Sequence, residues 1–381
     1  MNRQSSENRR SFFSTHPISD VSGFSYRALP RLPAGEYERF VKAWKLLASG
    51  GVQALVRKGD MAVTGAGVCE ALLARSWAVR YLDAEEMLRL ATVAQEVAAG
   101  LGTEDLGKAG VAGLQARALG EVGNALRVTG RAAEAEPAFE EAFDLEDEHG
   151  DPYLKAHLLH MRATLYGRTG EPGFAAQLLE LVSGFYDKSG DCYLGGRTRI
   201  TQSIYAAHLG QEDEALRLNE EGLAQIGREQ DPALVMTALH NRLLLLLRLG
   251  RKQEAKRTIE SWGGFAADGP VALRLRWMEG RILQSLGELE EAEATLRQSR
   301  DGLSILGLQR FTAMASLELA SALLLQDRFQ DAQTEALTAQ RILLGMADRE
   351  RYFGVLMVLD AAFSSGGVTP ELVERALAVL R

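Results

Sequence analysis

Cysteine and proline are scarce in this sequence, and each shortage limits the fold. The 381 residues include only two cysteines, Cys69 and Cys192, which lie far apart in the chain. This argues against a disulfide framework or a cysteine-rich metal site, and it predicts a cytoplasmic location because the cytosol is reducing. Only nine prolines occur and alternating Val/Ile/Thr runs are missing, while alanine, leucine, glutamate and arginine dominate. That composition favours helices over strands.

Long apolar runs and an excess of positive charge are also missing. The longest run of leucines, Leu243–Leu247, is far shorter than the roughly 18–20 residues that a membrane span requires. The start, Met1 to Phe13, is polar and lacks the apolar core of a secretory signal. The net charge is −8, whereas broad nucleic-acid binding needs a basic surface. We therefore expect no membrane contact and no nucleic-acid partner.

Motifs that carry chemistry are few. The segment Gly102–Ala109 imitates a phosphate-binding loop, but Ala109 stands where that motif needs Ser or Thr to hold magnesium. His157 and His160 are three residues apart, as in a metal pair, yet no carboxylate-histidine motif accompanies them. No Ser-His-Asp arrangement, glycosidase carboxylate pair or dinucleotide fingerprint is apparent. We therefore expect a protein that is not an enzyme and that holds no metal and no cofactor.

A repeat of about forty residues organises most of the chain. Each unit is marked by a glycine, or once an aspartate, at Gly130, Gly170, Gly210, Gly250, Gly287, Asp327 and Gly367. A small residue follows five positions later in six of the units: Ala135, Ala175, Ala215, Ala255, Ala292 and Ala332. Glycine ends helices because it takes positive φ without a Cβ clash, and a small side chain allows close helix packing. The pattern predicts a helix, a glycine turn and a second helix in each unit.

Two of these units, 118–135 and 280–292, resemble the tetratricopeptide repeat. The first has small residues at Gly123, Ala135 and Ala142, and Phe139 matches the aromatic position of the family. The period of about 40 residues exceeds the usual length of about 34, which is similar to long-helix variants in bacterial regulators and sensors.

The repeat departs from the family pattern at three places. Leu119 and Leu126 replace the usual Trp and Tyr, and the closing Pro is missing. The resemblance covers about 65–381 and implies an all-α fold, a right-handed α-solenoid of stacked antiparallel helix pairs.

The resemblance also divides the chain into three parts. Residues 1–34 are polar and rich in proline for their length, so we expect a flexible N-terminal arm. Residues 35–64 are expected to form capping helices, and 65–381 a solenoid of about eight helical pairs. Asp151, Asp231 and Thr369 each precede a proline and are predicted to cap the helices that follow. The segment 263–270 is either a short loop between units or a hinge.

The C-terminal helix leaves two interpretations open. Its apolar residues Leu372, Val373, Leu377 and Leu380 lie at the end of the array, where a solenoid usually needs a polar capping helix. Either they are covered locally, or they bind a partner or form a homodimer.

In stacked repeats of this family, the first helices line a concave groove. Projecting the repeat onto those helices places ten candidate binding residues there: Asn124, Arg127, His160, Arg168, Arg197, His240, Asn241, Arg274, Trp277 and Arg281. Arg80, Thr164 and Thr201 complete the set, which contains no acid.

Arginine forks pair with carboxylates and tryptophan is a frequent anchor, so the groove is expected to bind an acidic segment or a C-terminal carboxylate. Asn124 matches an asparagine of the peptide-clamping members, but their neighbouring lysines have no counterpart here. The alternative is that these are ordinary exposed polar residues, with Trp277 partly packed.

These features favour a non-catalytic protein- or peptide-binding scaffold or adaptor in a bacterial regulatory system. Two alternatives stay open: a sensor that responds to a peptide or metabolite, and an accessory or inhibitory subunit of an enzyme such as a protease. The latter would act through the N-terminal arm.

Overall fold

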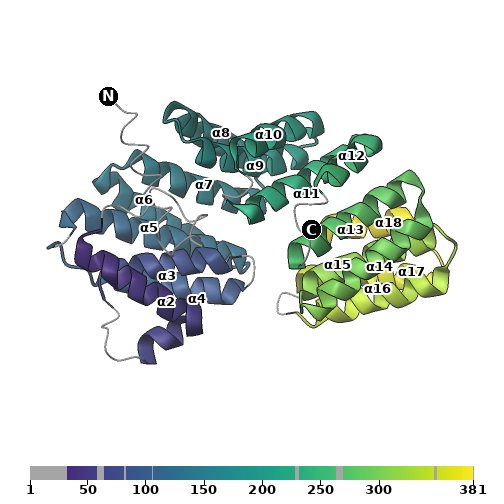
Figure 1. The fold of residues 1–381 in the computed structure, drawn as a ribbon, viewed down its shortest axis with the longest axis horizontal. Helices are drawn as coiled ribbons and strands as arrows, with labels where there is room; N and C mark the ends of the chain where they lie inside the picture. Colours follow the sequence, from purple (N-terminus) through teal and green to yellow (C-terminus); the bar gives the residue numbers. More distant parts are fainter. Residues whose placement is uncertain are drawn as a thin grey trace. The chain divides into compact units, whose positions relative to one another are not determined.

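The computed structural model describes residues 32–57, 64–80, 83–104, 106–227, 231–262, 269–346 and 350–380. Helices are the only regular elements in these ranges, so the all-α prediction is confirmed (Figure 1). The helices are α2 (Ala34–Arg57), α3 (Ala66–Val79), α4 (Ala84–Ala99), α5 (Gly107–Val128), α6 (Ala132–His149), α7 (Pro152–Arg168), α8 (Pro172–Lys188), α9 (Cys192–His208), α10 (Glu212–Gln225), α11 (Pro232–Arg248), α12 (Lys252–Trp262), α13 (Gly269–Leu286), α14 (Leu289–Ile305), α15 (Gln309–Leu324), α16 (Phe329–Leu344), α17 (Glu350–Ser365) and α18 (Pro370–Leu380). The predicted N-terminal arm and most of segment 263–270 lie outside the described residues.

The glycine ladder marks the turns within the helix pairs. The backbone has positive φ at five of its members: Gly130, Gly170, Gly210, Gly250 and Gly287. Asp327 takes the same left-handed conformation, with φ of 58°, where the repeat replaces glycine. The prediction that Gly367 forms the last of these turns is wrong by one residue, because Gly366 has positive φ (71°) and Gly367 does not. The turn therefore depends on local backbone conformation, which a short polar residue such as aspartate can adopt in place of glycine.

The predicted helix starts are also present. Asp151 accepts a hydrogen bond from the Tyr153 amide at 2.8 Å, and Asp231 accepts one from the Leu234 amide at 3.0 Å. Thr369 accepts one from the Leu372 amide at 3.3 Å. These side chains satisfy backbone donors that the first turn of a helix leaves unpaired.

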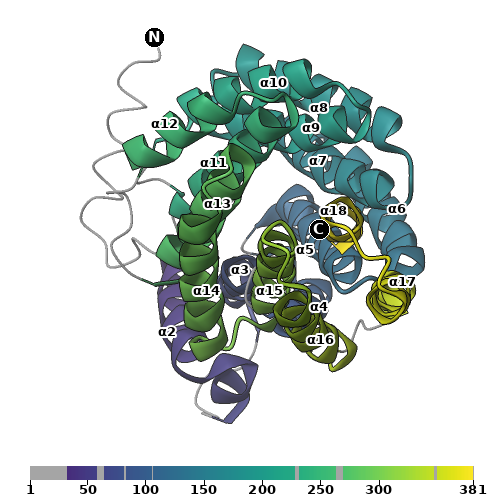
Figure 2. The ribbon, with the colours of Figure 1, turned by 90° about the vertical axis from the view of Figure 1, so that its right-hand side faces the viewer.

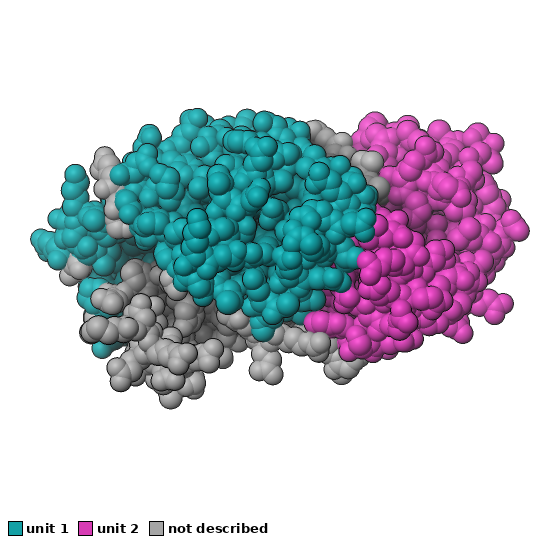
Figure 3. Space-filling view, turned by 90° about the horizontal axis from the view of Figure 1, so that it is seen from above, with its two compact units in different colours: residues 1–235 teal, residues 236–381 magenta. Residues whose placement is uncertain are grey.

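The chain forms two compact units, residues 1–235 and 236–381, whose boundary falls within α11 (Figure 3). In unit 1, α2 bends at Gly50 and Gly51 and packs on α3, and consecutive helices from α3 to α10 follow in antiparallel pairs. The core of unit 1 includes Phe139 and the small residues Ala135 and Ala142, all fully buried. In unit 2, a second core joins α13 to α18.

Glycine also permits a close helix contact between α9 and α10 in unit 1. A Cβ at Gly196 of α9 would lie 2.7 Å from the Gly222 carbonyl oxygen of α10, and a Cβ at Gly222 would lie 2.6 Å from the Gly196 carbonyl. The two backbones touch directly, which no larger residue at either position permits.

Candidate functional site

The first helices of four pairs, α3, α5, α7 and α9, share one side of unit 1. In Figure 2, α7 and α9 lie on the inner side of α8 and α10. We call this side the inner face of unit 1 and define it by Trp77, Arg80, Glu121, His160 and Arg197. Five of the ten predicted binding residues belong to unit 1 and five to unit 2.

Trp77 connects the first of these pairs to the fourth. The guanidinium carbons of Arg80 on α3 and Arg197 on α9 each lie 4.1 Å from the centroid of its indole ring. The ring is only 6% exposed, so both cation–π contacts are shielded from water. The inner face therefore contains an Arg–Trp–Arg stack, which we call the Trp77 stack.

Two further groups extend the Trp77 stack toward α11. The Tyr193 hydroxyl donates to the Asp231 carboxylate at 2.9 Å, and Arg80 lies 3.8 Å from the same carboxylate. Burial raises the pKa of Tyr193, which keeps the phenol protonated and able to donate. Asp231 thus has two roles, as a helix cap and as a counter-charge to Arg80.

A buried carboxylate lies in the middle of the inner face. Glu121 on α5 is 1% exposed, and its Oε1 lies 3.1 Å from Nε2 of His157 on α7. Burial alone would raise the pKa of Glu121, but the hydrogen bond and charge of His157, with Arg197 and Arg117, lower it below the ordinary value. Glu121 is therefore ionised at neutral pH and balances the arginines around it.

His160 is a neutral, hydrogen-bonded part of the same face. It is 7% exposed; its Nδ1 lies 3.2 Å from the Thr198 hydroxyl and its Nε2 lies 3.3 Å from the Thr201 hydroxyl. Thr198 donates its own proton to the Leu194 carbonyl at 2.7 Å, so it accepts from His160 and places the ring proton on Nδ1. Burial lowers the pKa of His160 well below 6.5, and nearby Arg197 lowers it further.

This histidine predicts an acid-sensitive fold for unit 1. Below pH 6.5 the unfolded chain gains a proton at His160 that the folded chain excludes, so stability falls as pH falls, by up to about 1.4 kcal/mol per pH unit. Glu121, whose folded pKa is lowered, adds a further loss only at lower pH, below its ordinary value of 4.5.

Urea unfolding between pH 7 and pH 5 measures this effect, and His160→Gln should flatten the slope. His208→Gln, at an exposed histidine that ends α9, is the comparison variant and should keep more of the slope than His160→Gln does. An equal slope in the wild type and in His160→Gln would contradict the assignment.

Asn124 and Arg127 bind each other rather than extending freely. Nε and Nη2 of Arg127 donate to Oδ1 of Asn124 at 3.2 and 2.8 Å, and Asn124 is 6% exposed. Arg168 is exposed at the end of α7. Thus Asn124, Arg127, His160 and Arg197 lie on neighbouring helices of one face, while Arg168 marks its edge.

The predicted residues of unit 2 are more deeply packed. Trp277 is 1% exposed and lies between His240 and Phe311, with ring centroids 5.8 and 6.4 Å away. Arg274 lies over the Phe311 ring at 5.1 Å, and the neighbouring Asn241 is half-buried. Trp277 is a core residue in this conformation and offers no accessible ring to a ligand.

Two of the candidate arginines have acidic neighbours that are not among the candidate residues. Arg281 pairs with Glu318 at 2.7 Å and lies 3.6 Å from Glu374. Arg80 faces Asp231 in the same way. Glu318 lies about one repeat from Arg281 on the next first helix, whereas Asp231 caps α11 and Glu374 lies on a second helix. The register of the first helices alone does not place these last two acids.

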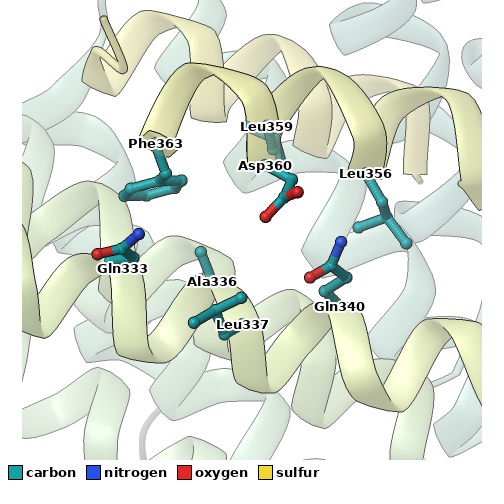
Figure 4. A pocket seen from close by; sticks show the side chains of 8 residues that line it. All are labelled: Gln333, Ala336, Leu337, Gln340, Leu356, Leu359, Asp360 and Phe363. Atoms are coloured by element: carbon teal, nitrogen blue, oxygen red, sulfur yellow. The ribbon is translucent and has the colours of Figure 1, made fainter. Parts of the chain in front are cut away.

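A small cleft lies in unit 2, between α16 and α17 (Figure 4). It encloses about 270 Å³ including its open mouth, and its lining comprises Gln333, Ala336, Leu337, Gln340, Leu356, Leu359, Asp360 and Phe363. None of these side chains is cationic, so the cleft is a poor site for a carboxylate.

Neither a metal site nor a membrane span is found in the described ranges. No three histidine, cysteine or carboxylate side chains gather there as metal ligands. Among the described helices, none combines the length and apolar character that a bilayer crossing requires.

Sequence comparison finds no matching family model and no matching curated protein. Solved structures do match. The apo form of RapI aligns with 82% of this chain and 86% of its own, at 12% identity and a TM-score of 0.57. A Rap protein complexed with Competence and Sporulation Factor aligns with 91% of this chain and 99% of its own, at 13% identity and a TM-score of 0.55.

NprR in complex with its cognate peptide NprX is similar as well, over 91% of this chain and 97% of its own, at 14% identity and a TM-score of 0.52. These structures are helical-repeat solenoids. The chain therefore has a tetratricopeptide-type fold, as the repeat resemblance implied.

Proposed function

We propose that this chain is a non-catalytic regulatory scaffold that binds a peptide on the inner face of unit 1. One observation carries the proposal: Arg80 and Arg197, from α3 and α9, both stack on Trp77, and Asn124 and Arg127 lie on α5 between these helices. The similar Rap and NprR structures contain a Competence and Sporulation Factor and a cognate peptide, respectively, which supports a peptide as the ligand class.

The chemistry of the face favours a ligand carboxylate. Arg80 donates to the Trp77 carbonyl at 2.7 Å and lies 3.8 Å from Asp231, and Arg197 stacks on Trp77. A C-terminal or acidic side-chain carboxylate would form the bidentate pair that guanidinium groups favour. Glu121 and Asp231 would repel a second acid, so the proposed peptide has one carboxylate at this point rather than an acidic run.

A matched pair of peptide pools tests this proposal. Fluorescent hexapeptides of mixed sequence are prepared with either a free or an amidated C-terminus, and binding is measured by anisotropy. We expect sequences from the free-acid pool to bind, and amidation to weaken them at least tenfold, because a charge-assisted pair contributes about 1.5–3 kcal/mol.

Arg197→Gln should weaken the same peptides about tenfold, since it removes that pair and keeps a polar side chain. Arg217→Gln is the matched control: Arg217 is exposed on α10 and pairs there with Glu214 and Glu221. Equal binding by the free and amidated pools, or equal losses in the two variants, would contradict the site.

The Trp77 stack also favours a sensor over a passive scaffold. It links α3 to α9, and Arg80 links α3 to the start of α11, so a ligand that competes for these arginines changes contacts between distant repeats. A ligand changes the conformation of a protein only if it binds one conformation more tightly than another, and competition for these arginines would supply that difference. A cytoplasmic bacterial setting completes the proposal, and the enzyme-subunit alternative depends on an arm that lies outside the described residues.

A homodimer through the C-terminal helices is proposed from one exposed surface. Phe353, Met357 and Val358 on α17 are 56%, 48% and 57% exposed, and together they form an uncharged apolar stripe. We expect Met357→Glu to lower the self-association constant at least tenfold in sedimentation equilibrium, because two like charges would meet at a two-fold contact. A wild-type chain that is still monomeric at 100 times the concentration used for the variant would contradict this.

A further inference from the structure

The last helix, α18, occupies an unusual place. In stacked helix pairs the first helices lie side by side and the second helices form the other layer. α18 is the second helix of its pair, yet it packs along α15, which is a first helix. Its Glu374 also lies close to Arg281 on α13, which is the first helix of the neighbouring pair. We call the surface of α13 and α15 around Arg281 and Glu318 the α13–α15 face.

The contact combines two buried apolar side chains and one charge. Val373 and Leu377 are four residues apart, so they share one side of α18, and both are fully buried. Glu374 lies beside them, 39% exposed, with its carboxylate 3.6 Å from Arg281. α18 is thus an amphipathic helix with a defined pattern: an apolar residue, an acid directly after it, and a second apolar residue three positions later.

Three features would allow α18 to leave this surface while the rest of unit 2 stays folded. α18 has 11 residues, fewer than the roughly 12–15 that an isolated helix needs for marginal stability. It follows a turn at Gly366 and Gly367, and Gly366 has φ of 71°. Arg281 also pairs with Glu318 at 2.7 Å, so the departure of Glu374 would leave this buried cation with an acidic partner.

We propose that the α13–α15 face is a docking surface for an amphipathic helix of a partner protein, and that α18 is the resident segment which that helix displaces. The partner helix has two apolar residues at the spacing of Val373 and Leu377 and an acid at the position of Glu374. This surface lies in unit 2 and does not depend on the peptide site in unit 1.

The first experiment measures how α18 behaves in the unaltered full chain. Hydrogen exchange should show α18 amides exchanging at least tenfold faster than those of α15 and α16, because α18 opens locally while the rest of unit 2 stays folded. Equal protection of α18 and α15 would mean that α18 is a fixed part of the core, and the proposal would be overturned.

The second experiment supplies the helix in trans. A fluorescent peptide of residues 368–381 is added to the full chain carrying Val373→Asp and Leu377→Asp, whose own α18 cannot occupy the face. Anisotropy should show binding at least tenfold tighter than to the wild-type chain, in which α18 competes. A variant that keeps its helical circular dichroism and does not bind the peptide, or a wild type that binds it equally well, overturns the proposal.

A pair of peptide variants tests the charge. Glu374→Gln and Glu371→Gln each remove one negative charge from the peptide, but Glu371 is exposed in the first turn of α18, whereas Glu374 lies 3.6 Å from Arg281. We expect Glu374→Gln to bind at least threefold more weakly than Glu371→Gln. Equal binding by the two peptides overturns the assignment of Arg281 as the recognition residue.

Discussion

Replacing Arg117 by methionine is expected to lower the free energy of unfolding of unit 1 by about 3–5 kcal/mol. Arg117 on α5 forms an ion pair with Glu70 on α3, and the two side chains are 8% and 0% exposed. Burial raises the pKa of Glu70, and Arg117 opposes that rise through its charge and hydrogen bond. Without Arg117, the carboxyl group must either stay charged without a partner or take up a proton in the folded state.

Urea unfolding at pH 7 measures the loss. The double change Glu70→Leu with Arg117→Met should recover most of it, because removing both charges leaves an apolar contact in place of an uncompensated ion. A single substitution that costs less than about 1 kcal/mol would show that water reaches Glu70, and the buried pair would then be no part of the core.

Trp77→Ala is expected to have the second largest effect, a loss of about 3–5 kcal/mol in the stability of unit 1. The substitution removes a large side chain that is 6% exposed and leaves a cavity under Arg80 and Arg197. It should also abolish binding of the free-acid peptides, because both guanidinium groups lose the surface that orients them.

Two milder substitutions separate packing from cation–π attraction. Trp77→Phe retains an aromatic face and loses no indole hydrogen bond, since Nε1 of Trp77 has no partner in the described residues. Arg197→Met retains most of the packing and should cost about 0.5–2 kcal/mol. If Trp77→Phe destabilised unit 1 as much as Trp77→Ala, the stacking account would be wrong.

The helix pairs were predictable because their signals are local. A glycine turn and a capping aspartate act within one or two turns of helix, so Gly130 and Asp151 specify their own surroundings. Gly366 and Gly367 show the limit of this logic: both are glycines, so the pattern does not distinguish which one takes positive φ.

The candidate site was only half predictable. The candidate arginines follow from the repeat register, and Arg281 pairs with Glu318 about one repeat away, but Arg80 lies beside Asp231, several repeats away. A search for complementary residues one period apart would have found the first pair and not the second. The contact between Trp77 and Arg197 spans three repeats and depends on how the stack curves, which no local pattern encodes.

The position of α18 was not predictable for a related reason. The sequence shows an amphipathic helix at the end of the array but not the layer in which it packs. Of the two interpretations of its apolar residues, local burial describes Val373 and Leu377, which are both fully covered by unit 2. The side chain of Leu380 lies outside the described residues.

Hydrogen exchange with and without a saturating free-acid peptide tests most directly whether unit 1 binds peptides on its inner face. The account predicts new protection on α3, α5, α7 and α9, around Trp77, Glu121 and Arg197, with little change on α6, α8 and α10. Protection confined to the outer helices α6, α8 and α10, or to unit 2, would contradict it.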